Sequence, residues 1–484
     1  GGRGRGLLIH GGGPRGPMAG STVRVLGFLA LSCALALGGC ASLENYTLRA
    51  APARQYVAAG DFQRAAEVFP ERSARGRNEV LIRLERGMLL HEQGRFKESF
   101  DELDLAWRRM KEYEERAVVS VSKTAAFAGT LAVNEQFSPY TGEDHEKVML
   151  HAINAVNFLM LGDLEAARVE VLRAYAVQRE LSERHPPQAP DTQGGEAGAT
   201  WEDSLRRADA EGYRTVSAKA AQVMSPYHNA YASIVSALVY ELTGEPGEAY
   251  IELKKAYEAF PASDYLANEL LRLSAVLGYV EDRRAWELRF GRKAPPVETG
   301  ASVVVFFSHG LGPTKEPVTL PIPLKNGVVF ASLPVYRFTP SAVSHARVSV
   351  GGRSTVTSPI LDIDAVAART LMDTFPGLFA KQVARSFLKA RAVSGMAHDR
   401  NGLGAFFGTL LAAATEQADL RTWSTLPKQI QASRIFVPAG ERQVQVEAFP
   451  TGYRAAVEIP PGARCLVVVC RHTDAGLSVH SKSY

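Results

Sequence analysis

Apolar residues recur at helical spacing through the first part of the chain, in segments separated by short turns that contain glycine. The turns fall at Gly60, Gly94, Gly162 and Gly244. Glycine is favoured there because the residue that ends a helix commonly takes the left-handed conformation. The pattern predicts a series of paired amphipathic helices, and we assign residues 40–295 to one helical domain.

The spacing of these turns resembles that of the tetratricopeptide repeat, a helix pair with a period of 34 residues. Gly60 and Gly94 are 34 positions apart, and Gly162 follows Gly94 after 68 positions, which is two periods. Around Gly244, the small, aromatic, large and stop residues of the repeat have counterparts at Ala237, Tyr240, Ala249, Leu253, Ala256 and Pro261. The interval between Gly162 and Gly244 breaks the register, and a Pro/Gly-rich run predicts a loop insertion at 183–208. The resemblance implies a solenoid whose groove binds partner proteins.

After residue 300 the pattern changes to short runs rich in Val and Phe, bounded by Gly and Pro. Such runs predict strands, which we place at 302–307, 318–322, 328–336, 346–350, 435–437, 444–449, 455–459 and 465–470. A helical insert at 363–420 separates the fourth strand from the fifth. The predicted fold class is therefore α+β and multidomain, with an N-terminal tetratricopeptide-like solenoid followed by a β-rich, sandwich-like domain at 300–475.

The N-terminal segment has the features of an export signal. Residues 1–17 are rich in Gly, Pro and Arg, and we interpret them as upstream or disordered sequence. From Met18 a short basic region leads into an apolar run that is too short for a bilayer, which needs about 20 residues, but suits a signal peptide at 18–39. The run ends in Leu37-Gly38-Gly39-Cys40, which resembles a bacterial lipobox.

That resemblance implies that Cys40 becomes the acylated N-terminus and attaches the protein to a membrane, because several acyl chains anchor stably. Ala41, rather than Asp, follows the cysteine. By resemblance to lipoprotein sorting rules, this favours the outer membrane, with the protein facing the periplasm.

Two further segments resemble a family of uncharacterised bacterial lipoproteins that contain such repeats. They are 310–315 (GLGPTK) and 418–427 (ADLRTWSTLP), the second continuing through Arg434 to 438–440. The resemblance implies no reaction. Asp419, Arg421, Trp423 and Arg434 are candidates for binding a partner, because Trp beside Arg offers a stacking surface. The alternative is an ion pair that holds the helical insert on the sandwich.

Composition argues against nucleic acid as a partner. The formal net charge is only +4, and Lys and Arg are spread along the chain without a basic cluster. Apart from the leader cysteines Cys33 and Cys40, the chain has Cys465 and Cys470. Five positions along one strand put these two thiols on opposite faces and too far apart for a disulfide. We predict no metal or cofactor.

Catalytic motifs are incomplete. His309 opens a His-Gly-Leu-Gly loop after a strand, as in the oxyanion loop of α/β-hydrolases, but the chain has no G-x-S-x-G elbow. His145 and His151 are six positions apart, so they face different sides of a helix and cannot share a zinc ion. The acidic run 143–146 instead suits a helix N-terminus.

The favoured function is an outer-membrane lipoprotein that acts as a scaffold or assembly factor and binds envelope proteins through its helical groove. One alternative is an envelope hydrolase with a site around His309. The other is a lipid or glycan carrier that uses the apolar run near Phe406.

Overall fold

The computed structural model describes residues 1–2, 45–121, 138–184, 211–298, 300–324, 327–396 and 418–484. Over these ranges the chain is mixed α/β, with twelve α-helices and three β-sheets, and all its strands lie after residue 300. Within the same ranges, no helix combines the length and the apolar character that a bilayer crossing requires. The lipobox with Cys40 and the apolar run near Phe406 lie outside the described residues, as does nearly all of the insertion predicted at 183–208.

Consecutive helices pair in antiparallel hairpins. The pairs are α2 (Tyr46–Ala58) with α3 (Phe62–Glu67), α4 (Glu79–Glu92) with α5 (Phe96–Val121), α7 (Asp144–Leu161) with α8 (Leu164–Arg184), α11 (Ala230–Leu242) with α12 (Pro246–Ala259), and α13 (Asp264–Val276) with α14 (Val280–Phe290). The four predicted turn glycines, Gly60, Gly94, Gly162 and Gly244, connect the first four pairs with φ between 75° and 85°. The prediction of helix pairs joined at these glycines is therefore confirmed.

The main sheet has five strands in the order β11-β10-β1-β7-β6. These are β11 (Gly476–Ser483), β10 (Cys465–Thr473), β1 (Ser302–His309), β7 (Gln429–Phe436) and β6 (Ser358–Asp362). β1 runs parallel to β10, with Ser302 opposite Cys465, and the other neighbours are antiparallel. We call this the central sheet.

A second sheet, the outer sheet, has four antiparallel strands in the order β5-β4-β8-β9. They are β5 (Arg353–Val356), β4 (His345–Val350), β8 (Gln443–Phe449) and β9 (Arg454–Glu458). The chain passes from β5 to β6 through Thr357, and so moves from the outer sheet to the central one at this residue.

The central sheet is covered on both faces, which gives three layers: helices, central sheet and outer sheet. Val303, Val305 and Phe307 of β1 pack against the outer sheet. Val304 and Phe306 point the other way into the helices, and the ring of Phe306 contacts that of Tyr231 at 5.6 Å. Alternate residues of a strand face opposite sides, so a strand buried on both faces tends to be a continuous apolar run, as 303–307 is.

The remaining elements form a smaller unit. The hairpin of β2 (Thr314–Leu324) and β3 (Gly327–Arg337) packs against α10 (Glu211–Ala220) and α15 (Ile363–Met396). Their shared cluster includes Val216, Leu333 and Phe375. The helix α15 continues through Pro376, within the predicted insert.

The last strand and the residues on either side of it connect the two halves of the chain. His480 lies against the turn between α4 and α5, within 3.1 Å of the carbonyl oxygen of Glu92, and the amide of Asp474 donates to the carbonyl of Ala58. The hydroxyl of Tyr484 donates to the carbonyl of Leu159. Helices and sheets therefore form one body.

All eight predicted strands are present, but their arrangement differs from the expectation. The structure adds β5, β6 and β11, and β11 lies beyond the boundary predicted at 475. The last predicted strands do not form a sandwich of their own, because β10 belongs to the central sheet while β8 and β9 belong to the outer one. The parallel pairing of β1 with β10 joins strands that are distant in sequence, and local pattern does not specify such a pairing.

Candidate functional site

The predicted residues Asp419, Arg421 and Trp423 lie in an irregular segment, 418–427, which precedes β7 and contacts the helices. The Arg421 guanidinium contacts the Asp419 carboxylate at 2.6 Å and donates to the carbonyls of Arg77 and Ser138. Trp423 is 1% exposed. The ion pair is thus internal to the segment, and the bonds from Arg421 to Arg77 and Ser138 hold the segment to the helical half. It is not the ion pair between the helical insert and the sandwich that the alternative described. Their role in binding a partner stays a prediction.

Glu85 on α4 fastens the middle of the segment. Its carboxylate accepts hydrogen bonds from the backbone N–H and the hydroxyl of both Ser424 and Thr425, at 2.6–3.0 Å, and one from the hydroxyl of Tyr46. Arg54 donates to the carbonyl of Ser424. Burial raises the pKa of Glu85, and the hydrogen bonds from Thr425 and Ser424 offset part of that rise.

Glu146 on α7 binds the same segment one residue earlier, at Trp423. It accepts hydrogen bonds from the backbone N–H of Trp423 at 2.7 Å and from the hydroxyl of Tyr140 at 2.6 Å. It also closes a capping box with Glu143, so the prediction that 143–146 begins a helix is confirmed. Burial, reinforced by the charge of Glu143, raises the pKa of Glu146 to about 7.

Arg434 lies on β7 in a buried network of four charges. It contacts Glu241 at 3.1 Å and Glu269 at 3.0 Å. Arg272 contacts the same two carboxylates, each at 2.7 Å. Burial alone would raise the pKa of Glu269, but Arg272 and Arg434 outweigh it and hold that pKa below its usual range. The network joins α11 and α13 to the central sheet.

Glu146 was noted from the sequence only as part of the acidic run 143–146, and Glu85 was not singled out, although a signal for Glu85 existed. Glu85 lies four positions from both Leu81 and Leu89, so it is on the apolar side of its helix. A carboxylate at such a position must be paired or hydrogen-bonded, because isolated burial of charge is costly. Ser424 and Thr425, however, are more than 300 positions away from Glu85 and cannot be identified as its partners from local pattern.

A cavity of about 470 Å³ opens beside Arg434, between the start of α13 and the point where the chain changes sheets. Its lining includes Ser344, Thr355, Thr357, Ser358 and Ser433, with Asn268, His345 and the charged pair Asp264 and Arg292. Ser358 accepts a hydrogen bond from the Asp264 backbone N–H at 3.0 Å. The volume of the cavity falls within the range of small-molecule sites.

His309 ends β1 and is 3% exposed. Its Nδ1 lies 2.8 Å from the Ser341 hydroxyl, and its Nε2 lies 3.1 Å from Gln429 and 3.3 Å from Gln431. Burial lowers the pKa of His309 to about 4. None of these partners, among the described residues, is the carboxylate that orients the histidine of a catalytic triad.

The other candidate ligands are spread apart. His145 lies 3.1 Å from the Thr370 hydroxyl, whereas His151 contacts Glu170 at 2.7 Å. Cys465 belongs to the core on the helical side of the central sheet and Cys470 to the core on the other side. The prediction that they lie on opposite faces of the strand is therefore confirmed, and both thiols are free.

Comparisons with family models, with curated proteins and with solved structures give no match. The function must therefore be inferred from the residues themselves.

Proposed function

We propose that the protein is a lipoprotein of the bacterial outer membrane, anchored through Cys40, that acts as a scaffold or assembly factor for other envelope proteins. The observation that carries the proposal is the series of helix hairpins joined at Gly60, Gly94, Gly162 and Gly244. Stacked helix pairs expose long continuous surfaces that suit protein binding, as in tetratricopeptide-like solenoids. A scaffold also needs a rigid body, which the shared core of helices and central sheet supplies.

The face of the hairpins that is turned toward the central sheet is occupied by this chain's own residues, including segment 418–427. The free docking surface is therefore the outer face, formed by α5, α8 and α12. These helices are neighbours, because Lys111 of α5 contacts Glu180 of α8, and Lys255 of α12 lies over the ring of Tyr175 of α8.

The outer face carries a set of apolar side chains that are between 43% and 50% exposed. They are Leu105, Val169, Leu172, Tyr175 and Ile251. Val169, Leu172 and Tyr175 are spaced three residues apart and so share one face of α8. Exposed apolar patches on a protein surface are typical of protein interaction sites. We call this set the outer patch.

Anchoring is tested by replacing the proposed acylation site. In the bacterial host, Cys40→Ala should move the protein out of the outer-membrane fraction and remove label from a radioactive fatty acid. Cys33→Ala, in the same leader, is the matched control and should change neither. Retention of label and location by the Cys40→Ala protein would refute the anchor.

Docking is tested by photocrosslinking from the outer patch in living cells. A crosslinker placed at Tyr175 should capture a reproducible envelope protein, and Leu172→Lys should abolish the capture. The control Leu288→Lys changes a side chain that is 86% exposed on α14, outside the patch, and should leave it intact. Equal capture by all three proteins, or no reproducible capture, would refute the docking surface.

A hydrolase with a site at His309 is a second candidate, favoured by the 2.8 Å contact between His309 and Ser341. If Ser341 is a nucleophile, a fluorophosphonate probe should label the native protein at that residue, and His309→Ala should abolish the labelling. Absence of labelling in the folded protein would exclude a serine-hydrolase site there.

A further inference from the structure

The helix α2 has an exposed apolar stripe on its surface. Leu48, Pro52 and Tyr56 are all exposed, and Leu48 keeps 70% of its surface accessible to solvent. They are four positions apart, so they lie along one face of the helix. The exposed residues of α2 include Gln55 as well, and none of them is charged. We call Leu48, Pro52 and Tyr56 the α2 stripe.

The α2 stripe cannot turn inward, because the opposite face of the helix is fixed to the body of the protein. The Thr47 hydroxyl donates to the carbonyl of Lys315 on β2 at 2.7 Å, and Arg54 donates to the carbonyl of Ser424. The buried residues of the helix are Tyr46, Ala50, Ala53, Arg54 and Val57. The stripe is therefore a fixed feature of the surface.

A short stretch of chain connects α2 to the proposed acylation site. The helix begins at Tyr46, and Asn45 caps it by accepting a hydrogen bond from the backbone N–H of Leu48 at 3.4 Å. Cys40 precedes Tyr46 by six positions. A fully extended chain covers at most ~3.6 Å per residue, so the start of α2 lies within about 22 Å of Cys40. An acyl anchor on Cys40 therefore keeps α2 close to the bilayer surface.

Under this constraint, lipid is the partner that suits the α2 stripe. Tyrosine is enriched at membrane–water interfaces, because its ring is apolar and its hydroxyl is polar. Since the anchor already holds the helix near the membrane, contact with lipid is an intramolecular event with a high effective concentration, and a few apolar side chains can make it. A helix face that is turned to water usually carries charged residues, as α5 does at Lys97 and Asp101.

We propose that the α2 stripe lies on the lipid bilayer that holds the anchor, as a second membrane contact that fixes the orientation of the protein. The inference rests on the proposed acylation of Cys40. An amphipathic helix at a membrane lies in the plane of the interface, with its apolar face about 5–10 Å into the boundary between headgroups and acyl chains. The α2 stripe shares no residue with the outer patch.

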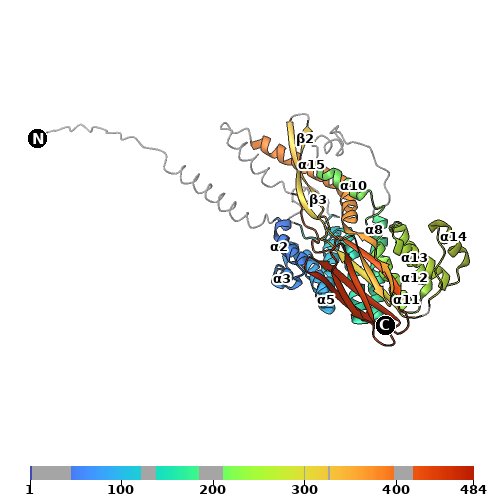
Figure 1. Cartoon of the computed structure of the whole chain (residues 1–484). Coiled ribbons are helices and arrows are strands. Elements are labelled where there is room, and N and C mark those ends of the chain that lie inside the picture. The colour runs from blue at the N-terminus through green and yellow to red at the C-terminus, as the bar shows by residue number, and fades with distance from the viewer. Residues whose placement is uncertain (3–44, 122–137, 185–210, 299, 325–326, 397–417) are drawn as a thin grey trace.

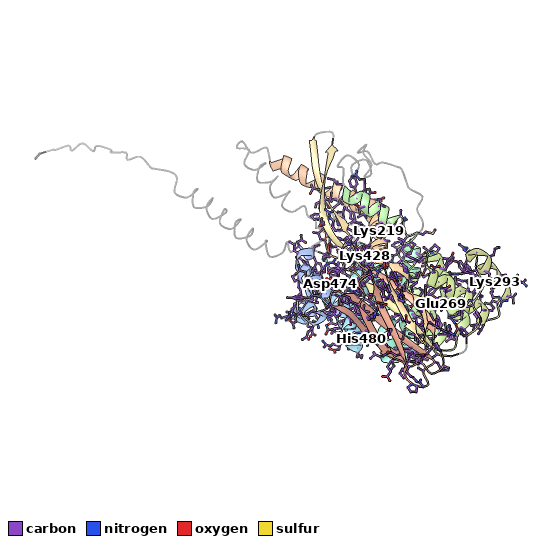
Figure 2. All side chains as sticks on the ribbon, viewed as in Figure 1. Lys219, Glu269, Lys293, Lys428, Asp474 and His480 are labelled. Atoms are coloured by element: carbon purple, nitrogen blue, oxygen red, sulfur yellow. The ribbon has the colours of Figure 1, made fainter. Side chains whose placement is uncertain are left out.

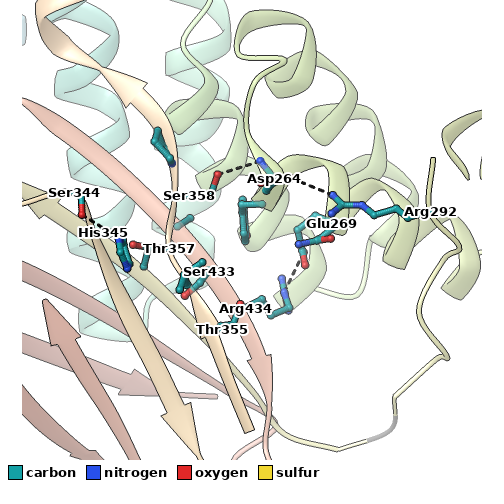
Figure 3. A pocket seen from close by; sticks show the side chains of 15 residues that line it. Asp264, Glu269, Arg292, Ser344, His345, Thr355, Thr357, Ser358, Ser433 and Arg434 are labelled. Carbon is teal, nitrogen blue, oxygen red and sulfur yellow. Dashed lines mark hydrogen bonds and ion pairs between the residues drawn. The ribbon is translucent and has the colours of Figure 1, made fainter. Parts of the chain in front are cut away.

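The contact is tested with protein purified from membranes of the bacterial host and reconstituted into vesicles of phosphatidylethanolamine and phosphatidylglycerol. Leu48→Cys introduces a thiol for a fluorescent nitrobenzoxadiazole label, and Cys465 and Cys470 do not compete because they are buried. Lipids with a nitroxide near the headgroup should quench this label about twofold more than a label at Leu288→Cys, because an interfacial helix lies at that depth. Leu288 is 86% exposed on α14, at the other end of the helices (Figure 1).

Adding Pro52→Asp and Tyr56→Asp should lower the quenching at position 48 to that of the control, because carboxylates are costly to bring into lipid. Circular dichroism shows whether each variant is folded, and the mass of the protein shows whether it carries acyl chains. Absence of acyl chains would refute the anchor, and this inference with it. In acylated protein, equal quenching at positions 48 and 288, or quenching that the two Asp substitutions leave unchanged, would overturn the lipid contact and leave the anchor intact.

Discussion

The carboxylate of Glu85 holds segment 418–427 against the helices, so its replacement by the isosteric amide should destabilise the whole protein. In Glu85→Gln, one carboxylate oxygen becomes an NH₂ group, which cannot accept the bonds that Thr425 donates at 3.0 Å and 2.6 Å. The hydroxyl of Thr425 can turn to accept from the new amide, but its backbone N–H cannot.

The size of the effect follows from these contacts. A buried N–H left without an acceptor costs ~1–3 kcal/mol. The three bonds to the other oxygen, from Tyr46 and from Ser424, weaken from charge-assisted to neutral, at ~0.5–1 kcal/mol each. Removing a buried charge offsets part of the loss. We expect the free energy of unfolding to fall by about 2–3 kcal/mol.

Urea unfolding measures the free energy of unfolding of Glu85→Gln, and hydrogen exchange shows which part of the protein is destabilised. Protection of the Ser424 and Thr425 amides should fall before that of the β1 amides, because those two N–H groups bond directly to the altered side chain. Glu258→Gln, at an exposed site on α12, is the control and should change stability by less than about 0.5 kcal/mol. If Glu85→Gln also stays within about 0.5 kcal/mol of the unaltered protein, the carboxylate does not hold the segment.

Three further predictions concern pH, the last strand and the thiols. Glu146, whose folded pKa is about 7, binds a proton more tightly in the folded chain than in the unfolded one, so its contribution to stability should decrease as pH rises from about 4.5 to 7. Relative to Glu146→Gln, the unaltered protein should lose on the order of 3 kcal/mol over that range, and a difference that does not vary with pH would contradict this. Removing residues 476–484 deletes β11 and the Tyr484 bond to Leu159, so the truncated chain should unfold at a much lower urea concentration; an unchanged midpoint would show that the strand is dispensable. In a chain carrying Cys33→Ala and Cys40→Ala, Cys465 and Cys470 should resist a thiol reagent until urea is added, because burial raises both pKa values, and rapid labelling of the native protein would be the opposite result.

The local sequence pattern was enough to predict most of the individual helices and strands. The turn glycines and the apolar runs placed the helix pairs and eight strands, because each depends on residues a few positions apart. The short strand β5 has exposed polar residues, and β11 alternates weakly and ends the chain, so neither gives a strong periodic signal.

The arrangement of the strands and of the buried charges was harder to predict, because it depends on residues that are distant in the sequence. The parallel pairing of β1 with β10 joins residues more than 160 positions apart. Arg434 was named from the sequence, but the carboxylates that neutralise it, on α11 and α13, could not be. The cavity results from the mismatch in length between β6 and β7, which no local motif encodes.

The turns of the first three helix hairpins have a second task besides reversing the chain. A side-chain carbon added at Gly60, Gly94 or Gly162 would lie within 2.7–2.9 Å of Thr473, His480 or Lys482, respectively. The β10–β11 edge therefore runs along the ends of these hairpins and contacts each turn at a fixed position. An ordinary solenoid can lengthen by duplicating a unit. Here an extra hairpin between these three would move every later turn away from its contact residue, so the number of units in this part of the array is set by the positions of Thr473, His480 and Lys482 along the β10–β11 hairpin.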